Sequence, residues 1–376
     1  MRTLIYLLIL SIATPVLAET TQHPIWGGFE YKWTKHPHRF SLVASRFEEG
    51  KHLMGVKIGA CPPDTASYKV PYQMLSPTNG LVIKRGTIRL ETRGSINKWQ
   101  SATETENNLL STDQNANAVV ILNGFRVRSR QVDLSKTGRS CNLKGKAAVW
   151  ALTMATGCKK KACSEWDSGW HFSGIDIGVS AIRGKDQSFG VKATVGIKPA
   201  DSPDEVNGGD CRCHGANWPT SIATAHKIEI DYMILTNSAG QLTAKGFVMA
   251  DNIQRTTHWK LQKKLSVSGQ PGFNSATAGL TRFAMDIGGG RYPEPGRYVR
   301  EMGFRILGFD YKKKTGQAEI VTKAFFSNVS ELPHWWVGKA RVEGMLIQFK
   351  NTTPLKHHLL EGEVSKENQQ RLPLAP

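Results

Sequence analysis

The chain has 376 residues, of which 40% are hydrophobic and ten are tryptophan. This composition excludes an intrinsically disordered chain, and the length suffices for two or three domains or one large β assembly. The formal net charge is +18 at pH 7. The surface is therefore expected to attract polyanions or anionic membranes in a salt-dependent way, unless the charge serves solubility alone.

The first eighteen residues predict a signal peptide. Arg2 precedes the apolar stretch Leu4–Ile12, and Val16 and Ala18 occupy the −3 and −1 positions before Glu19. The apolar stretch is shorter than the roughly 20 residues of a membrane-spanning helix, which favours cleavage over an uncleaved anchor. No later stretch is long and apolar enough to cross a membrane. The mature chain is expected to be secreted, or periplasmic or otherwise extracellular.

Alternation of apolar and polar residues with a two-residue period predicts a series of strands. In chain order, the clearest are residues 40–47, 81–90, 174–182, 189–197, 227–235, 280–287, 304–309 and 340–349. Helix signals are scarce: residues 101–113 are the best candidate, and residues 355–371 form a short helix or a disordered tail. Many short strands separated by frequent turns predict an all-β fold, an antiparallel β-sandwich or jelly-roll-like architecture.

Six cysteines follow the signal peptide: Cys61, Cys141, Cys158, Cys163, Cys211 and Cys213. An even number in an exported chain predicts three disulfides. Cys158 and Cys163 enclose a four-residue loop that closes readily, whereas a bond between Cys211 and Cys213 would be strained. We therefore expect Cys158 to pair with Cys163, and Cys211 and Cys213 to pair with Cys61 and Cys141 in an order that the sequence leaves open.

The second half of the chain contains an internal repeat with an offset of 76 residues. Seven identities fall within positions 230–263 when these are aligned without gaps on 306–339, where roughly two would arise by chance. Each copy predicts a strand, a turn, a second strand, a His-Trp pair and a third strand. We interpret the two units, residues 226–269 and 302–345, as similar strand meanders that pack face to face.

This repeat suggests a division of the mature chain. Residues 19–217 would form a disulfide-containing β domain, and residues 218–350 a duplicated β-sandwich region. Residues 351–376 would form a polar tail. The signal peptide, residues 1–18, completes the expected organisation.

The His-Trp pairs of the repeat are candidate ligand-binding residues. His258 and Trp259 align with His334 and Trp335, and Trp336 follows directly. An indole beside an imidazole can hold a sugar ring, with the ring stacked on the indole and its hydroxyls hydrogen-bonded. The alternative is that Trp259 and Trp335 fill the core. Because adjacent strand residues point to opposite faces, Trp335 or Trp336 is expected to be exposed or buried in a partner.

A run of three lysines, Lys312, Lys313 and Lys314, falls in the predicted turn of the second unit. Its counterpart in the first unit, residues 236–238, carries no charge. The lysines are thus no part of the repeat's architecture, which favours a solvated or binding role. We interpret this turn, and the similar run at residues 159–161, as candidate polyanion contacts.

Motifs for cofactors and catalysis are weak. Residues 210–214 resemble a metal cluster, but the one-residue spacing of their cysteines favours disulfide chemistry over zinc. Asp201, Asp204, Glu205, Asn207 and Asp210 gather oxygen ligands that would suit calcium, but their spacing matches no EF-hand loop, which favours a solvated surface loop. No cofactor is otherwise expected. Serine-hydrolase, metalloprotease and phosphate-loop motifs are absent.

The sequence therefore predicts a non-enzymatic exported protein that binds anionic glycans or envelope polymers through basic loops and exposed aromatic side chains. One alternative is a structural component that forms homo-oligomers or a surface complex. Another is a secreted hydrolase whose site the motifs do not reveal.

Overall fold

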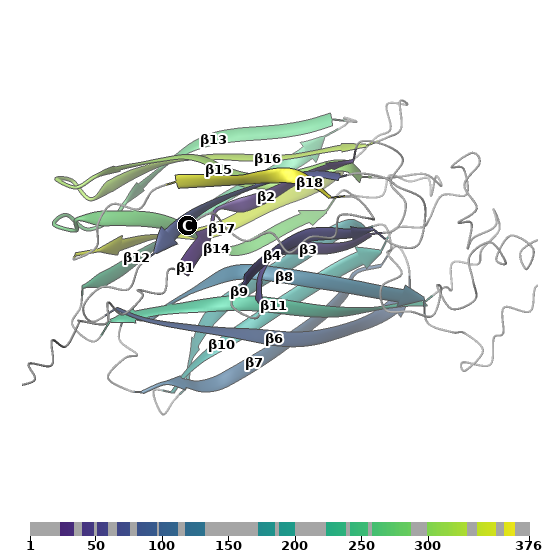
Figure 1. Ribbon diagram of the computed structural model, residues 1–376, viewed down its shortest axis with the longest axis horizontal. Coiled ribbons are helices and arrows are strands. Elements are labelled where there is room, and N and C mark those ends of the chain that lie inside the picture. Colours follow the sequence, from purple (N-terminus) through teal and green to yellow (C-terminus); the bar gives the residue numbers. More distant parts are fainter. Residues whose placement is uncertain are drawn as a thin grey trace, which may run out of the picture.

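The computed structural model describes residues 23–33, 40–48, 51–58, 66–75, 81–95, 98–111, 117–131, 172–184, 188–199, 223–237, 241–254, 258–286, 299–328, 337–350 and 357–364. All the secondary-structure elements within these residues are β-strands, and all the strand pairs are antiparallel. Figure 1 shows these strands running lengthwise through an elongated molecule. The expected all-β, sandwich-like class is confirmed.

The strands form three sheets, which we call A, B and C. Sheet A contains, in order, β1 (His23–Trp26), β5 (Ala66–Leu75), β2 (Gly28–Trp33), β15 (Val299–Lys312), β16 (Gln317–Asn328) and β13 (His258–Ser268), and β18 (His357–Val364) also pairs with β5. Sheet B contains β4 (Lys51–Ile58), β3 (Phe40–Glu48), β8 (Val119–Gln131), β11 (Ala223–Asn237) and β6 (Leu81–Ser95). Sheet C contains β12 (Leu242–Gln254), β17 (Val337–Phe349), β14 (Ser275–Asp286), β9 (Phe172–Arg183), β10 (Phe189–Pro199) and β7 (Gln100–Leu110).

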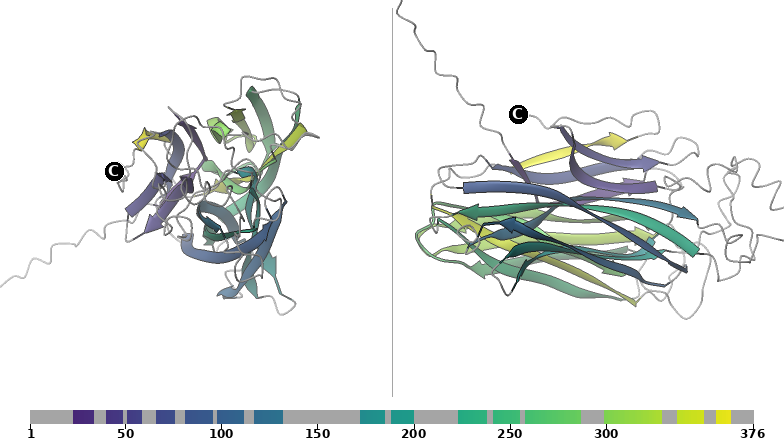
Figure 2. Two further views of the ribbon diagram at one scale, coloured as in Figure 1. Left: turned by 90° about the vertical axis from the view of Figure 1, so that its right-hand side faces the viewer. Right: turned by 90° about the horizontal axis from the view of Figure 1, so that it is seen from below.

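The three sheets share one large hydrophobic core. Phe304 of sheet A, Ile230 of sheet B and Ile177 of sheet C belong to the same cluster, and all three are fully buried. The rings of Phe283 and Phe304 stack across the interface of sheets A and C, with centroids 5.8 Å apart. The left panel of Figure 2, which looks along the strands, shows the groups of strands around this common interior. A sheet has one apolar face to bury, and here each sheet buries its face against the other two.

β14 of sheet C lies where all three sheets pack against one another. Its residues from Ser275 to Thr281 are all buried, so both faces of this segment are covered. Ala276 and Ala278 belong to a cluster with β15 and β16 of sheet A. On the opposite face, a Cβ on Gly279 would lie 2.7 Å from the side chain of Ile121 in β8 of sheet B. Small residues here let three layers approach one another.

The structure confirms all eight strands expected from alternation and corrects two helix predictions. Residues 101–113 were the best helix candidate, but residues 100–110 form β7, which pairs with β10. Residues 357–364 of the expected helical or disordered tail form β18. β7 is rich in polar residues because it is an edge strand, so it lacks the apolar alternation that marked the others.

The duplication into two similar meanders is not confirmed. Strands do occur in the expected order, β11, β12 and β13 in the first unit and β15, β16 and β17 in the second. In the first unit, however, the three strands lie in three different sheets. β12 instead pairs with β17, and β13 with β16. Side-chain alternation predicts strands and their faces, but partners are chosen by packing between distant segments.

The boundary expected at residues 217/218 is not visible in the topology, because strands from both sides of it share every sheet. The ends of the strands instead fall into two groups, at opposite ends of the molecule. Ser95 pairs with Ala223, Pro199 with Phe172 and Trp33 with Ala66, and all these strand ends lie toward the right of Figure 1. The hairpin between β15 and β16 lies at the opposite end.

Candidate functional site

The three candidate lysines lie where the sequence placed them, in the turn between β15 and β16. Lys312, Lys313 and Lys314 are all exposed. The backbone N–H groups of Thr315 and Gly316 both donate to the carbonyl oxygen of Lys312, at 3.2 and 2.9 Å. Gly316 has a φ of +71°, a conformation that favours glycine. The predicted turn is therefore confirmed, and its side chains are free of any packing role.

A buried glutamine forms hydrogen bonds with the segments beside this turn. Gln348 of β17 is 1% exposed, and its Nε2 donates to the carbonyl oxygen of Gln270 and to the Tyr311 hydroxyl, both at 2.8 Å. Gly269 N donates to the Gly316 carbonyl oxygen at 3.0 Å, which joins the 268–274 loop to the turn. The lysines thus project from a hydrogen-bonded end of sheets A and C. We call the four lysines at this end, Lys312, Lys313, Lys314 and Lys350, the lysine tip.

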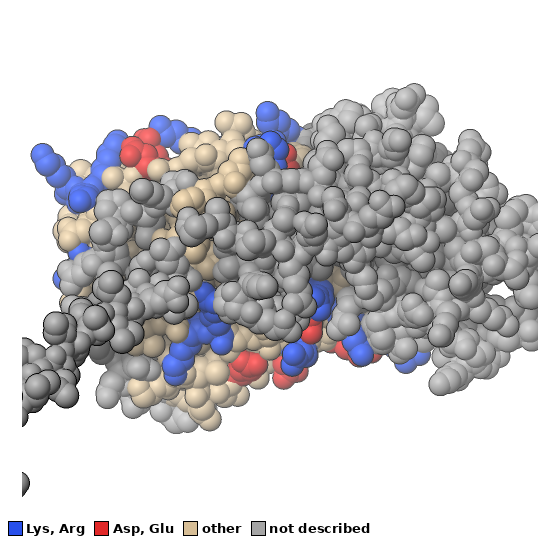
Figure 3. Space-filling view, in the orientation of Figure 1, with Lys and Arg blue, Asp and Glu red and all other residues tan. Residues whose placement is uncertain are grey.

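The electrostatics of the lysine tip are positive. Lys350 is exposed, with its ammonium 5.5 Å from the ring centre of Phe273. Glu319 is already paired with Lys264 at 2.7 Å. The hydrogen bond from Lys264 lowers the pKa of Glu319, and the nearby charge of Lys312 acts in the same direction. Figure 3 shows blue side chains projecting at the left, where Figure 1 places the β15–β16 hairpin.

The structure separates the lysines from the first His-Trp pair. His258 and Trp259 begin β13, whose other end, Ser268, pairs with Gln317 beside the lysine tip. A strand of 11 residues spans about 35 Å. The lysines and the first His-Trp pair therefore lie at opposite ends of β13. The side chains of His258 and Trp259, and all of His334, Trp335 and Trp336, lie outside the described residues.

Other candidate residues also fall outside the described part of the chain. These are all six cysteines, the second lysine run at residues 159–161 and the oxygen-rich loop proposed for calcium, residues 201–210. Within the described part, no group of three or more His, Cys, Asp or Glu side chains could hold a metal ion. No helix among the described residues has the length and apolar character needed to span a membrane.

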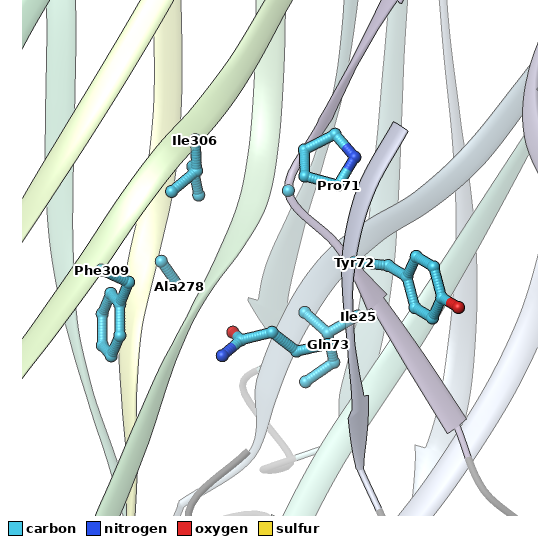
Figure 4. A pocket seen from close by; sticks show the side chains of 8 residues that line it. Ile25, Pro71, Tyr72, Gln73, Ala278, Ile306 and Phe309 are labelled. Carbon is cyan, nitrogen blue, oxygen red and sulfur yellow. The ribbon is translucent and has the colours of Figure 1, made fainter. Parts of the chain in front are cut away.

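A small pocket lies where β1 and β5 meet β14 and β15 (Figure 4). It is lined mainly by apolar side chains, including Ile25, Ala278 and Phe309. Its most polar group is the amide of the buried Gln73, which accepts a hydrogen bond from the Thr277 hydroxyl. A space that admits about one water molecule is a packing gap between sheets and no ligand site.

Sequence reasoning missed the one exposed aromatic side chain among the described large hydrophobic residues. Trp99, just before β7, is 42% exposed and lies on the outer face of sheet C. It belongs to neither unit of the repeat, and it directly precedes the segment 101–113 that the sequence predicted as a helix. The available signal was an isolated tryptophan between two polar segments.

Comparisons of the chain with protein-family models, with curated proteins and with solved structures found no match.

Proposed function

We propose that this protein is an exported, non-enzymatic binding protein that recognises an anionic glycan or another anionic polymer of a cell envelope. The lysine tip would be its electrostatic contact. The observation that carries the proposal is that three exposed lysines project together from a turn that is held by backbone hydrogen bonds and by Gln348. Such an arrangement concentrates positive charge on a backbone that needs no further ordering when a ligand binds.

Two further features support the proposal. The chain carries a net charge of +18, so long-range attraction to a polyanion operates on the whole molecule. The lysine tip also keeps most of its charge uncompensated, since the nearby Glu319 is paired with Lys264. A polyanion that neutralises the lysines would release counterions, which makes binding weaken steeply with salt.

The test compares two variants of equal charge. In the tip variant, Lys312, Lys313 and Lys314 become Gln; in the control variant, the exposed Lys192, Lys245 and Lys260, which lie on three separate strands, become Gln. On heparin and on an anionic envelope polysaccharide, the tip variant should elute at clearly lower salt than the control. The slope of log affinity against log salt should become shallower by about two to three for the tip variant.

Two results would overturn the proposal. The first is that the unmodified protein elutes at the same low salt as a neutral protein. The second is that the tip and control variants lose affinity equally, which would assign the binding to diffuse net charge. Light scattering of the same samples checks the assembly alternative, because loss of retention with a change of oligomeric state would favour it.

A further inference from the structure

The indole of Trp99 packs against two glycines of neighbouring strands. A Cβ on Gly174 of β9 would lie 2.7 Å from Cη2 and Cζ2 of the indole, and a Cβ on Gly196 of β10 would lie 3.2 Å from Cε3 and Cζ3. The six-membered ring therefore rests over both glycines. Glycine weakens a strand, and its presence marks a place where another group must approach the backbone closely.

The indole N–H of Trp99 is held by the carboxylate of Asp286, which is itself paired with a lysine. Trp99 Nε1 donates to Oδ2 of Asp286 at 3.4 Å, and the Nζ of Lys198 donates to Oδ1 of the same carboxylate at 3.2 Å. The side chain of Asp286 is 33% exposed, so solvent still reaches the carboxylate. Lys339, the partner of Asp286 in the β14–β17 register, is exposed. The indole is thus oriented before any ligand arrives.

The geometry points to a second binding site: we propose that Trp99 is a stacking platform for a neutral hexopyranose unit, with Asp286 accepting hydrogen bonds from its hydroxyls. The apolar C–H face of a pyranose ring fits the open face of a fixed indole, and a few placed polar groups at the rim give orientation. A buried core role does not account for an exposed indole whose orientation is set by both glycines and a carboxylate.

The charged groups beside the indole favour an uncharged sugar. The carboxylate beside the indole accepts hydrogen bonds from uncharged hydroxyls, and its ion pair with Lys198 leaves little net charge there to attract an anionic substituent. The proposed anionic units of the ligand would instead meet the lysine tip. The two sites lie at opposite ends of the strands, since β14 runs from Ser275 to Asp286 and spans about 40 Å. This inference rests on the proposed function, because it assumes that the ligand is a glycan.

The test is affinity electrophoresis through gels that contain one soluble neutral polysaccharide of hexopyranose units each: a β-1,4-glucan, a β-1,3-glucan and a galactomannan. The unmodified protein should be retarded by at least one of them. Trp99→Ala should weaken that retardation by about tenfold or more, and Trp99→Phe should retain part of it. Asp286→Asn should weaken it less than Trp99→Ala. Val248→Ala is the matched control, because Val248 is a 49% exposed apolar residue of the same sheet.

Absence of retardation on all three neutral polysaccharides would overturn the proposal, as would equal retardation of Trp99→Ala and the unmodified protein. A purely structural Trp99 would lower the thermal midpoint of the alanine variant and leave retardation unchanged. The two proposals fail separately. Trp99→Ala should keep the heparin retention of the unmodified protein, and the tip variant should keep its retardation on the neutral polysaccharide.

Discussion

Gln348 and Gln270 are joined by two reciprocal hydrogen bonds. Gln270 N donates to Gln348 Oε1 at 2.8 Å, and Gln348 Nε2 donates to the Gln270 carbonyl oxygen at 2.8 Å. The side-chain amide of Gln348 thus bonds the backbone of Gln270 as a neighbouring strand would. This pairing attaches the 268–274 loop to β17 beneath the lysine tip.

Replacing Gln348 with Leu should destabilise the protein. The substitution removes both hydrogen bonds to the backbone of Gln270 and also the bond to Tyr311, while the buried position of the side chain is kept. We expect the free energy of unfolding to fall by about 2 to 4 kcal/mol, measured by guanidinium denaturation. Gln317→Ala is the control, since it loses one exposed hydrogen bond to Ser266 and should change stability by less than about 0.5 kcal/mol. Equal losses in the two variants would contradict this role of Gln348.

Stability should fall in mild acid because of His226. This side chain is fully buried, and burial lowers its pKa to about 3 from the ordinary value of 6.5. The unfolded chain therefore takes up a proton below pH 6.5 that the folded chain refuses, so stability is complete above pH 6.5 and declines toward pH 3. Between pH 6.5 and 4.5 the loss from this residue should be about 2 to 3 kcal/mol.

The measurement for His226 is the thermal or denaturant midpoint as a function of pH. His226→Gln keeps a polar side chain but cannot titrate, so its stability should decline less between pH 6.5 and 4.5. The half-buried His23 remains in both proteins, and burial together with the charge of Arg85 lowers its pKa to about 4. A variant with an unchanged pH profile would rule out His226 as the source.

Reduction of the three predicted disulfides should loosen one end of the sheets. The segments that carry the six cysteines connect strands whose described ends include Ile58, Gln131, Phe172 and Ala223, all toward the same end of the molecule. Mass spectrometry of the mature, unreduced protein should show a chain beginning at Glu19 with no free thiol. After reduction, amide exchange should rise at these strand ends and stay unchanged at the lysine tip. Two or more alkylatable cysteines before reduction would contradict the three-disulfide prediction.

Much of the local structure could be predicted from the sequence. Alternation alone identified segments such as 81–90 and 189–197 as strands, because side chains of a strand must divide between two faces. The turn at Lys313–Gly316 was likewise predictable, since its charged residues and glycine have no place inside a sheet. The exposure of the three candidate lysines follows from that local chemistry.

The partners of the strands and the platform at Trp99 were decided only by the tertiary structure. Nothing near residue 99 indicates that its indole rests on Gly174 and Gly196, because these glycines come from strands that sheet pairing brings alongside. For the same reason β12 and β13 separate into sheets C and A, although they are consecutive in the chain. A two-residue period specifies which side of a strand is buried, and every antiparallel pairing of apolar faces satisfies it. The choice among pairings depends on how distant side chains pack together, as Phe283 does on Phe304, and that information is not local.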